Sequence, residues 1–431
     1  MNIKYYIRLV AAFLVRFKAL IAVGIVIGIL VFLVFRFVFP RFVTQDVERI
    51  GIAGRFSTDS LPKSVVEQVS MGLTKVNKSG EATAGLAQSW VEDEDGKIWR
   101  FSLGEHRWQD GKKVSSADID YNFEDVGVRR PDDKTIEFEL KSGFSPFPLV
   151  VSRVVFRKGL LGTGEWRVGN VEFVGNYIRS LTLKNGSNSR KVYKFYPSED
   201  QVKLAFKLGQ IDKMVELISS KPFDEWSTVE VDEIVNYSRF VGVFYNTEDE
   251  ILASKSFRQA LSYAIDKDSF EGPRATGPIS PYSWAYNPQV KGYDYDVGRA
   301  KELLEDTADI KLVTTPPLLD IAEKVAGYWR EIGVATTVQV TSVVPEEFQA
   351  FLVMYDIPAD PDQYSTWHSE QFGTNISRYK NPRIDKLLED GRLEMDMDER
   401  KKIYLDFQRF LLEDSPATFL FHPVSYTVSR R

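Results

Sequence analysis

The chain has 431 residues, an ordinary apolar content of 43% and no cysteine. It is long enough for two or three domains, each with its own core. Without cysteine, disulfides, zinc–thiolate sites, cysteine nucleophiles and an acylated-cysteine anchor are excluded. The first 45 residues hold six of the 55 Lys and Arg residues and no acid, so the remainder carries 49 basic and 61 acidic residues, a formal charge of −12. The chain after residue 45 is so acidic that we expect it to bind no nucleic acid. It is expected to tolerate cationic or zwitterionic ligands.

An apolar run near the amino terminus predicts a membrane anchor. Residues 19–35 form 17 uncharged residues, and apolar character continues to Pro40. A helix of roughly 20 apolar residues spans the hydrocarbon core of a bilayer. A cleaved signal peptide would end in small residues, but Phe35, Phe37 and Phe39 stand at that place. We therefore expect an uncleaved transmembrane helix.

Basic residues predict the orientation of this anchor. Four Lys or Arg residues precede the apolar run and two follow it, and the side with more basic residues stays in the cytoplasm. Residues 1–45 are therefore expected to form a cytoplasmic tip and a single transmembrane span. The large domain is expected outside the cell membrane, extracellular or periplasmic. The short tip leaves no room for a cytoplasmic signalling module.

The first elements beyond the anchor are a hairpin and a short helix. Asp95 and Gly96 predict a hairpin turn, and the strand 98–103 follows them. The segment 108–111 predicts another turn. Ser115 then predicts the amino-terminal cap of a short helix.

The second half of the chain alternates strands and helices. The strand 240–246 leads into a helix over 256–266, whose apolar residues share one face. A strand–helix–strand unit over 310–341 predicts parallel strands with a right-handed connection. Two more helices are predicted from Asn381, which caps the first of them, and from Asp398.

The segment 355–367 combines acids, aromatic residues and prolines. A carboxylate on a stiff loop ringed by aromatic side chains suits a ligand with a cationic end and an apolar body. An open α/β sheet binds ligands at the carboxyl ends of its strands, and this loop lies just beyond such an end. We therefore expect the ligand site here.

Several stretches resemble the family 5 extracellular solute-binding proteins, which are the peptide-binding receptors of ABC importers. They are Leu86-Ala87-Gln88-Ser89-Trp90, Trp108-Gln109-Asp110-Gly111, Gly162-Thr163-Gly164, the helix from Phe257 to Lys267, and the segment 355–423. The resemblance covers most of the chain beyond residue 80. It implies an α/β fold of the periplasmic-binding-protein-like type II, with two α/β lobes joined by crossover strands and a reduced extra subdomain. In this chain the predicted transmembrane helix precedes that fold.

The order of the family segments and the crossover strand near Phe240 imply a division into domains. The expected parts are lobe I with residues 46–57, 150–238 and 425–431, a subdomain with residues 58–149, and lobe II with residues 239–424. The stretch 50–86 is shorter than relatives usually have, which is why the subdomain is expected to be reduced.

The resemblance also implies site residues. In peptide-binding relatives an Asp shortly before a loop proline pairs with the α-amino group of the ligand, and Asp356 with Pro361 resembles this arrangement. Trp284 lies in a segment that resembles a family segment reaching into the cleft, and it is expected to contact the ligand. The expected pocket walls are Tyr355, Tyr364 and Trp367, and Asn375 is expected to add a polar contact. The alternatives are that Asp356 caps a turn or pairs with a neighbouring Arg, and that the aromatic residues are core. Asp360 and Asp362 are expected to hold the loop.

The chain departs from its relatives at three positions. Asp356 lies five residues before Pro361 instead of four, and Val353 stands where a Trp is common. Dipeptide-binding relatives place an Arg that grips the carboxylate end of the ligand in the strand where this chain has only Lys311. A longer peptide held by main-chain hydrogen bonds therefore fits better than a dipeptide gripped at both ends.

The resemblance implies a membrane-anchored receptor that captures peptides in an inter-lobe cleft and delivers them to the permease subunits of an ABC importer. We expect a monomer without cofactor, metal or catalytic activity. One alternative is a receptor for a nickel complex, for which His368 is the one hint. A hydrolase is disfavoured because the three His residues are scattered and no Gly-x-Ser-x-Gly motif occurs.

Overall fold

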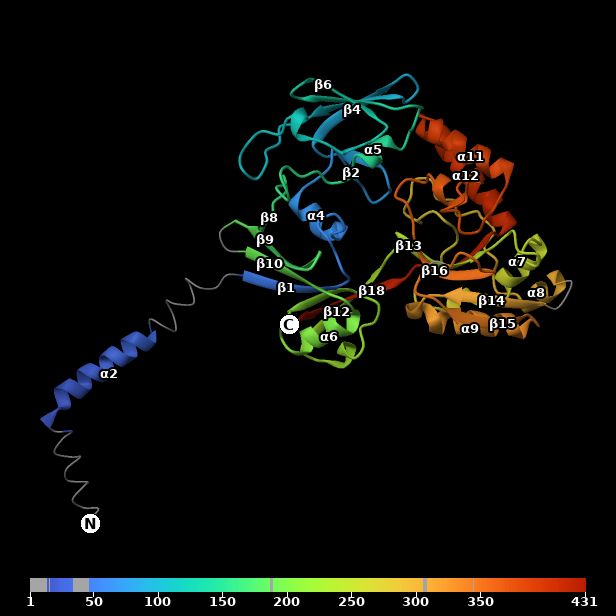
Figure 1. Cartoon of the computed structure of the whole chain (residues 1–431). Coiled ribbons are helices and arrows are strands. Elements are labelled where there is room, and N and C mark those ends of the chain that lie inside the picture. The colour runs from blue at the N-terminus through green and yellow to red at the C-terminus, as the bar shows by residue number, and fades with distance from the viewer. Residues whose placement is uncertain (1–13, 15, 34–45, 187–188, 305–307, 344) are drawn as a thin grey trace, which may run out of the picture.

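The computed structural model describes residues 14, 16–33, 46–186, 189–304, 308–343 and 345–431. Figure 1 shows the body of the protein as three parts, which are built on a seven-stranded sheet, a five-stranded sheet and a four-stranded sheet. A short two-stranded sheet accompanies the four-stranded one.

The seven-stranded sheet has the order β12-β18-β11-β1-β10-β9-β8. Its strands are β1 (Asp46–Ala53), β8 (Arg167–Val174), β9 (Tyr177–Asn185), β10 (Ser189–Tyr196), β11 (Lys213–Leu217), β12 (Val229–Val235) and β18 (Val424–Arg430). β1 pairs in parallel with β10 and β11, and the other neighbours are antiparallel. Successive residues of a strand point to opposite faces. Phe195 accordingly packs in the cluster that includes helix α4 (Lys63–Val69), and Tyr196 in the cluster that includes helix α6 (Glu199–Lys207).

The five-stranded sheet has the order β15-β14-β16-β13-β17. Its strands are β13 (Arg239–Tyr245), β14 (Asp309–Thr314), β15 (Ala335–Val340), β16 (Ala350–Asp356) and β17 (Ala417–Phe421). Its helices are α7 (Lys255–Tyr263), α8 (Val297–Leu303), α9 (Leu319–Glu331), α10 (Tyr364–Trp367), α11 (Pro382–Leu393) and α12 (Met397–Asp414). Alternate residues of β13 enter two different cores, with Val243 facing α7 and α9, and Phe244 facing α10, α11 and α12.

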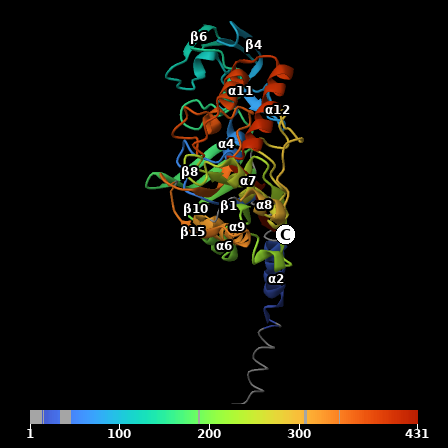
Figure 2. The ribbon, with the colours of Figure 1, turned by 90° about the vertical axis from the view of Figure 1, so that its right-hand side faces the viewer.

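The four-stranded sheet, β4-β5-β7-β6, forms the core of the third part. The elements there are β2 (Thr74–Val76), β3 (Ala82–Ala84), β4 (Ala87–Asp93), β5 (Ile98–Leu103), β6 (Gly127–Asp132), β7 (Thr135–Glu139) and α5 (Phe147–Val150). Turned by 90°, the structure shows α11 and α12 next to this part, and α7, α8 and α9 further from it (Figure 2).

Most of the elements predicted along the chain are present. The unit β14–α9–β15 has parallel strands, and Asn381 caps α11 by accepting a hydrogen bond from the backbone N–H of Arg383. Ser115 and Asp118 form a capping box around a short 3₁₀ helix. The second carboxyl-terminal helix begins one residue before the predicted position, because the side chain of Asp396 caps it.

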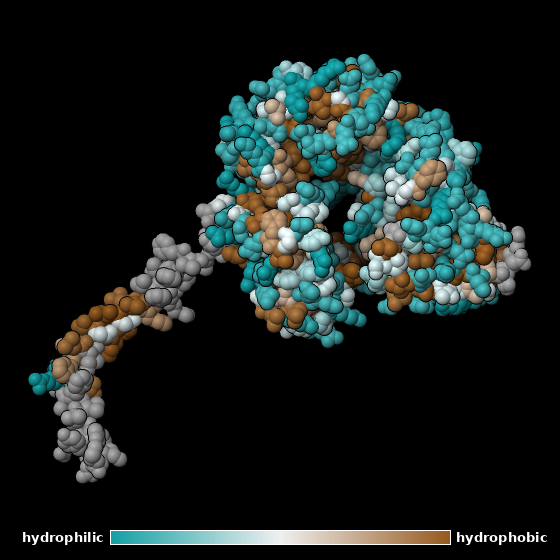
Figure 3. Space-filling model, in the orientation of Figure 1, coloured by the Kyte–Doolittle hydropathy of each residue, from teal (hydrophilic) through white to brown (hydrophobic). Residues whose placement is uncertain are grey.

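Helix α2 (Lys18–Leu33) is the described part of the predicted anchor and has 16 residues. It exposes its apolar side chains, among them Leu20, Ile25 and Phe32 (Figure 3). No helix within the described residues reaches the length and apolar character that a membrane span requires. Residues 34–40 of the predicted span lie outside the described residues.

Candidate functional site

Two short segments join the seven-stranded sheet to the five-stranded sheet. Three residues separate β12 from β13, and two residues separate β17 from β18. In the seven-stranded sheet, β1 is parallel to β11. β18 is antiparallel to both β11 and β12, so β11 and β12 run in the same direction. β1, β10 and β11 therefore end at the same edge as β12, which is the edge that faces the joining segments.

The five-stranded sheet shows the same arrangement from the other side. β13 starts at the joining segment, and β16 is antiparallel to it, so β16 ends there at Asp356. β14 and β15 share the direction of β16 and end at the same edge. The carboxyl ends of both sheets thus face one another, the position where open α/β sheets bind ligands. The surface is hollowed where the three parts of the body meet (Figure 3).

Asp356 lies at this edge and is exposed. Its carboxylate accepts a hydrogen bond from the Nε of Arg239, the directly opposite residue on β13. The Asp356 side chain is 76% exposed and that of Arg239 is 46% exposed. The pairing with a neighbouring Arg, which the sequence left open, is therefore present in this structure. A ligand ammonium group would have to replace Arg239 to reach the carboxylate.

Two of the predicted aromatic residues pack in the core on the face of the sheet opposite to Asp356. Tyr355 is half-buried between the rings of Phe240 and Phe244, and its hydroxyl group lies 2.7 Å from the Oγ1 of Thr366. Trp367 is fully buried and stacks on Phe244, with ring centroids 5.6 Å apart. In this structure Trp367 is therefore a core residue, and Tyr355 connects that core to the edge of the sheet.

The two other predicted aromatic residues contact arginine side chains. The Tyr364 ring lies 4.1 Å from the guanidinium carbon of Arg392 and 4.0 Å from the ring of His368. The Trp284 ring lies 5.5 Å from the guanidinium carbon of Arg400. Such cation–π contacts stabilise the loop around these rings.

The side chain of Asn375 forms hydrogen bonds to other residues of the protein. Its Nδ2 donates to the carbonyl groups of His368 (3.3 Å) and Tyr379 (2.8 Å), and its Oδ1 accepts from the backbone N–H of Tyr379. It is 5% exposed. In this structure Asn375 therefore closes a turn, and its side-chain amide faces no open surface.

A buried ion pair holds the loop that follows Asp356. The two Asp360 carboxylate oxygens accept bonds of 2.9 and 2.6 Å from Nη1 and Nη2 of Arg400 on α12. The Nε of Arg400 donates to the carbonyl oxygen of Gly391 at 2.8 Å. Burial alone would lower the pKa of Arg400, but the Asp360 carboxylate raises it above its ordinary value. The sequence predicted the structural role of Asp360, whereas its partner Arg400 gave no signal among the many charges of α12.

Asp362 forms a second pair with the same helical region. It accepts a bond of 2.9 Å from the Nε of Arg392 on α11 and a bond of 3.0 Å from the backbone N–H of Tyr364. Burial raises the pKa of Asp362 above its ordinary value, and Arg392 offsets this only partly. Its predicted role in holding the loop is therefore also confirmed.

The turn between β2 and β3 rests on this loop. A Cβ on Gly80, where φ is +84°, would lie 2.3 Å from the carbonyl oxygen of Ala359, so the contact requires a glycine. The backbone N–H of Trp284 donates to the carbonyl oxygen of Ser79 at 3.1 Å, and that of Ser145 donates to the carbonyl oxygen of Arg392 at 2.8 Å. These contacts join segments far apart in the chain, so sequence patterns gave no sign of them.

The residues with metal-binding chemistry are dispersed. Across the part of the chain that the structure describes, no three His, Asp or Glu side chains group as metal ligands would. His368 is 3% exposed, and its Nε2 lies 3.4 Å from the carboxylate of Glu389.

Comparison with known proteins identifies the family. The model of the bacterial extracellular solute-binding proteins, family 5 (middle), matches residues 81–375. The chain belongs to this family. Its members are transport receptors and not enzymes. The predicted resemblance is therefore confirmed.

Curated relatives match most of the chain. The oligopeptide-binding protein OppA of Bacillus subtilis is 22% identical over 84% of this chain and 83% of its own length. The dipeptide-binding protein of Escherichia coli is 22% identical over 81% of this chain and 83% of its own length.

Solved structures share the fold. NikZ from Campylobacter jejuni, in complex with Ni(L-His), aligns with a TM-score of 0.74 and 22% identity over 90% of this chain and 95% of that chain. AppA from Bacillus subtilis, in complex with a nonapeptide, aligns with a TM-score of 0.69 and 19% identity over the same shares, 90% and 95%. The predicted α/β fold of the periplasmic-binding-protein type is thereby confirmed.

Replacing Asp360 with Asn is expected to lower the free energy of unfolding by about 3 kcal/mol or more, because it leaves the buried Arg400 guanidinium without a counter-charge. Urea denaturation of the full-length chain, followed by tryptophan fluorescence, measures this loss. Asp356→Asn is the matched control, and its exposed pair should contribute less than about 1 kcal/mol. Equal losses in the two variants would contradict a special role for the buried pair.

Proposed function

We propose that the protein captures peptides in the gap between the two large sheets and delivers them to the permease subunits of an ABC importer. The proposal rests mainly on one observation. The carboxyl ends of strands from both large sheets face one another, and the exposed Asp356 carboxylate lies among them. Relatives named as oligopeptide-binding and dipeptide-binding proteins support it. The receptor would act as a monomer without a cofactor.

The short joining segments suit a hinge. Two segments of three and two residues allow one lobe to rotate against the other, with the dihedral changes confined to a few positions. A ligand between the lobes contacts both of them in the closed form alone. Binding therefore shifts the population towards the closed form, which the permease would recognise.

The ligand that fits best is an oligopeptide with a free amino terminus. Asp356 offers an exposed anionic partner for the ammonium group. Dipeptide-binding relatives place an Arg where this chain has Lys311. We therefore do not propose that the protein tightly binds the terminal carboxylate of a dipeptide. Main-chain hydrogen bonds would hold the rest of the peptide.

A nickel complex is the second candidate ligand, since the relative NikZ is in complex with Ni(L-His). His368, the one hint from the sequence, is buried beneath Tyr364 and beside Glu389. It faces no open surface in this structure, which favours the peptide.

The division into domains belongs to the same proposal. We infer lobe I from residues 46–57, 150–238 and 425–431, the subdomain from 58–149, and lobe II from 239–424. The membership of the strands in the three larger sheets supports these boundaries.

We also infer that residues 19–40 tether the receptor to the cell membrane with the body outside. The uncharged apolar run, the exposed apolar side chains of α2 and the excess of basic residues before the run support this tether. A tethered receptor stays beside its permease without a lipidated cysteine.

Protease added to intact, wall-stripped cells is expected to remove the body of the protein, because the proposed topology places it outside. Immunoblotting against the body before and after treatment measures its loss. A cytoplasmic protein serves as the control for membrane integrity. Survival of the body until the membrane is broken would contradict the proposed topology.

Asp356→Asn is expected to weaken the binding of free-amino peptides by about 2 to 5 kcal/mol, because an ammonium group inside a closed cleft needs an ionised partner. Calorimetry compares a free-amino peptide with its amino-acetylated form on both proteins. The acetylated peptide should already bind weakly to the wild type and lose little more in the variant.

Arg239→Gln is the matched control, since it removes the internal ion pair but keeps the carboxylate. Free-amino peptides should bind to it at least as tightly as to the wild type, because no internal cation competes for Asp356. Equal affinity of the wild type for free and acetylated peptides would mean that Asp356 is structural.

A further inference from the structure

One end of the seven-stranded sheet carries a row of like charges. Residues that lie directly opposite one another on neighbouring strands point to the same face of a sheet. Arg190 on β10 lies opposite Lys184 on β9, and Lys184 lies opposite Arg167 on β8. On its other side Arg190 lies opposite Val47, the second residue of β1. Arg167, Lys184 and Arg190, which we call the cationic row, are therefore neighbours on one face.

Helix α6 covers a different part of the same face. Gly51 of β1 shares the face of the row, because its partner Lys194 stands four residues beyond Arg190 on β10. A Cβ on Gly51 would lie 3.0 Å from the Val202 side chain of α6, so α6 packs on this face. Among the described residues, the apolar cluster that includes α6 contains none from β8 or β9. These two strands are therefore uncovered at the row, and their cations there are exposed.

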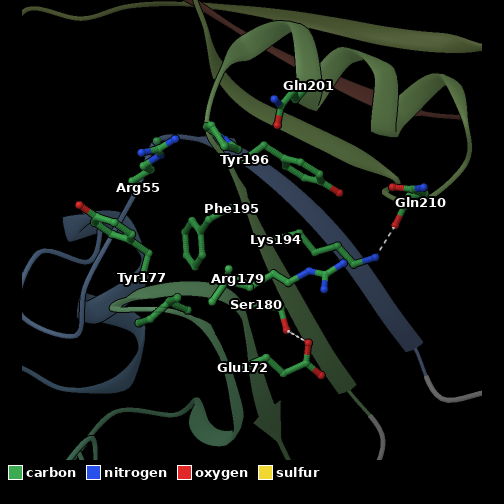
Figure 4. Close-up of a pocket in the computed structure, with 14 residues that line it drawn as sticks. Arg55, Glu172, Tyr177, Arg179, Ser180, Lys194, Phe195, Tyr196, Gln201 and Gln210 are labelled. Atoms are coloured by element: carbon green, nitrogen blue, oxygen red, sulfur yellow. Dashed lines mark hydrogen bonds between the residues drawn. The ribbon is translucent and has the colours of Figure 1, made fainter.

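The cationic row has no internal counter-charge. In the described part of the chain no carboxylate lies within ion-pair distance of its three members. A second row on the same face, Lys194, Ser180 and Glu172, lies nearer the gap and lines a pocket of about 700 Å³ (Figure 4). There Lys194 donates to the carbonyl oxygen of Gln210 at 3.1 Å, and Glu172 accepts a bond of 2.9 Å from Ser180. The charges of the second row thus have partners within the protein, unlike those of the cationic row.

The cationic row suits an extended anionic surface. Like charges directly opposite one another on neighbouring strands repel, and neighbouring strands lie about 4.8 Å apart. An external anion relieves this repulsion. The three cations extend over two strand spacings, roughly 10 Å, so anions arranged side by side match them better than one small ion does. The chain after residue 45 has a formal charge of −12, so the row is a local exception.

The tether holds this row close to a membrane. Residues 19–40 are inferred to lie in the bilayer, and Pro40 and Val47 are seven residues apart. An extended chain covers seven residues in at most about 25 Å. Arg190 lies opposite Val47 on the next strand, about 5 Å further away. The row therefore begins within about 30 Å of the point where the tether leaves the bilayer, whatever the orientation of the body.

We propose that the cationic row binds the anionic phospholipid headgroups of the membrane that holds the tether. This assignment depends on the tether inferred above. Anionic headgroups form a repeated array of negative charge, which attracts Lys and Arg side chains beside a membrane anchor. Arg167 and Arg190 are the first and second residues of their strands, and the gap lies at the other end of β10. A body docked through the row therefore leaves the gap accessible to solutes.

The full-length chain in lipid nanodiscs tests this assignment. The chain has no cysteine, so Asn170→Cys introduces a single site for a fluorescent label. Asn170 is exposed and lies opposite Thr182, two residues from Lys184 on the same face. Quenching by an acceptor on the headgroups should be stronger in discs of phosphatidylcholine and phosphatidylglycerol in equal parts than in phosphatidylcholine alone. The difference should disappear at about 1 M salt, where screening acts within roughly 3 Å.

The variant Arg167→Gln/Lys184→Gln/Arg190→Gln removes the row. At roughly fivefold per cation, it should lower the ratio of docked to free bodies about a hundredfold and abolish the dependence on phosphatidylglycerol. The matched control replaces three exposed subdomain cations and changes the net charge equally; it is Lys75→Gln/Lys78→Gln/Lys112→Gln. The control should keep the lipid dependence. Both variants should bind a free-amino peptide with the wild-type affinity in calorimetry.

The outcomes separate this assignment from the proposed function. Equal quenching of the wild type in the two kinds of disc, or a row variant that is quenched like the wild type, overturns the docking while peptide capture stands. Loss of the lipid dependence in the subdomain control as well would mean that net charge acts instead of the row, and this also overturns the assignment. A full-length chain that enters neither kind of disc overturns the tether and the assignment with it.

Discussion

The two short connections between the large sheets constrain everything else in this molecule. Only three residues separate β12 from β13, and only two separate β17 from β18. Both sheets must therefore present their strand ends to the same narrow space. Side chains that follow those strands are then brought together without any need for sequence proximity. The exposed Asp356 owes its position to this constraint.

A rigid loop complements this hinge geometry. Asp360 and Asp362 attach the segment after β16 to α12 and α11 through arginine pairs, and the turn at Gly80 supports it from the subdomain. A carboxylate presented from such a segment loses little conformational entropy when a ligand binds, and preorganisation of this kind raises affinity without additional contacts.

The sequence predicted local features well and long-range partners poorly. Caps such as Asn381 and turns such as that at Asp95 depend on neighbouring residues, so their patterns were sufficient. The resemblance to family 5 identified the fold class, which periodicity alone would have left open. Arg239 and Arg400 were missed, because pairs between residues separated by 117 and 40 positions leave no local pattern. Trp367 illustrates a second limit, since an aromatic residue beside a site and one in a core have the same local sequence.

The subdomain contact at Gly80 has a consequence for the motion of the lobes. The two large lobes are joined covalently by the connections, and the subdomain is joined covalently to the seven-stranded part by the chain on both sides. Its contact with the five-stranded part is the third link. This link includes the backbone hydrogen bonds of Ser79 and Arg392, the close approach of Gly80 to Ala359, and a cation–π contact of Arg392 with Phe144. The three parts therefore form a ring around the gap. A rotation of one large lobe against the other must therefore either break this non-covalent link or bend the chain where the subdomain joins the seven-stranded part.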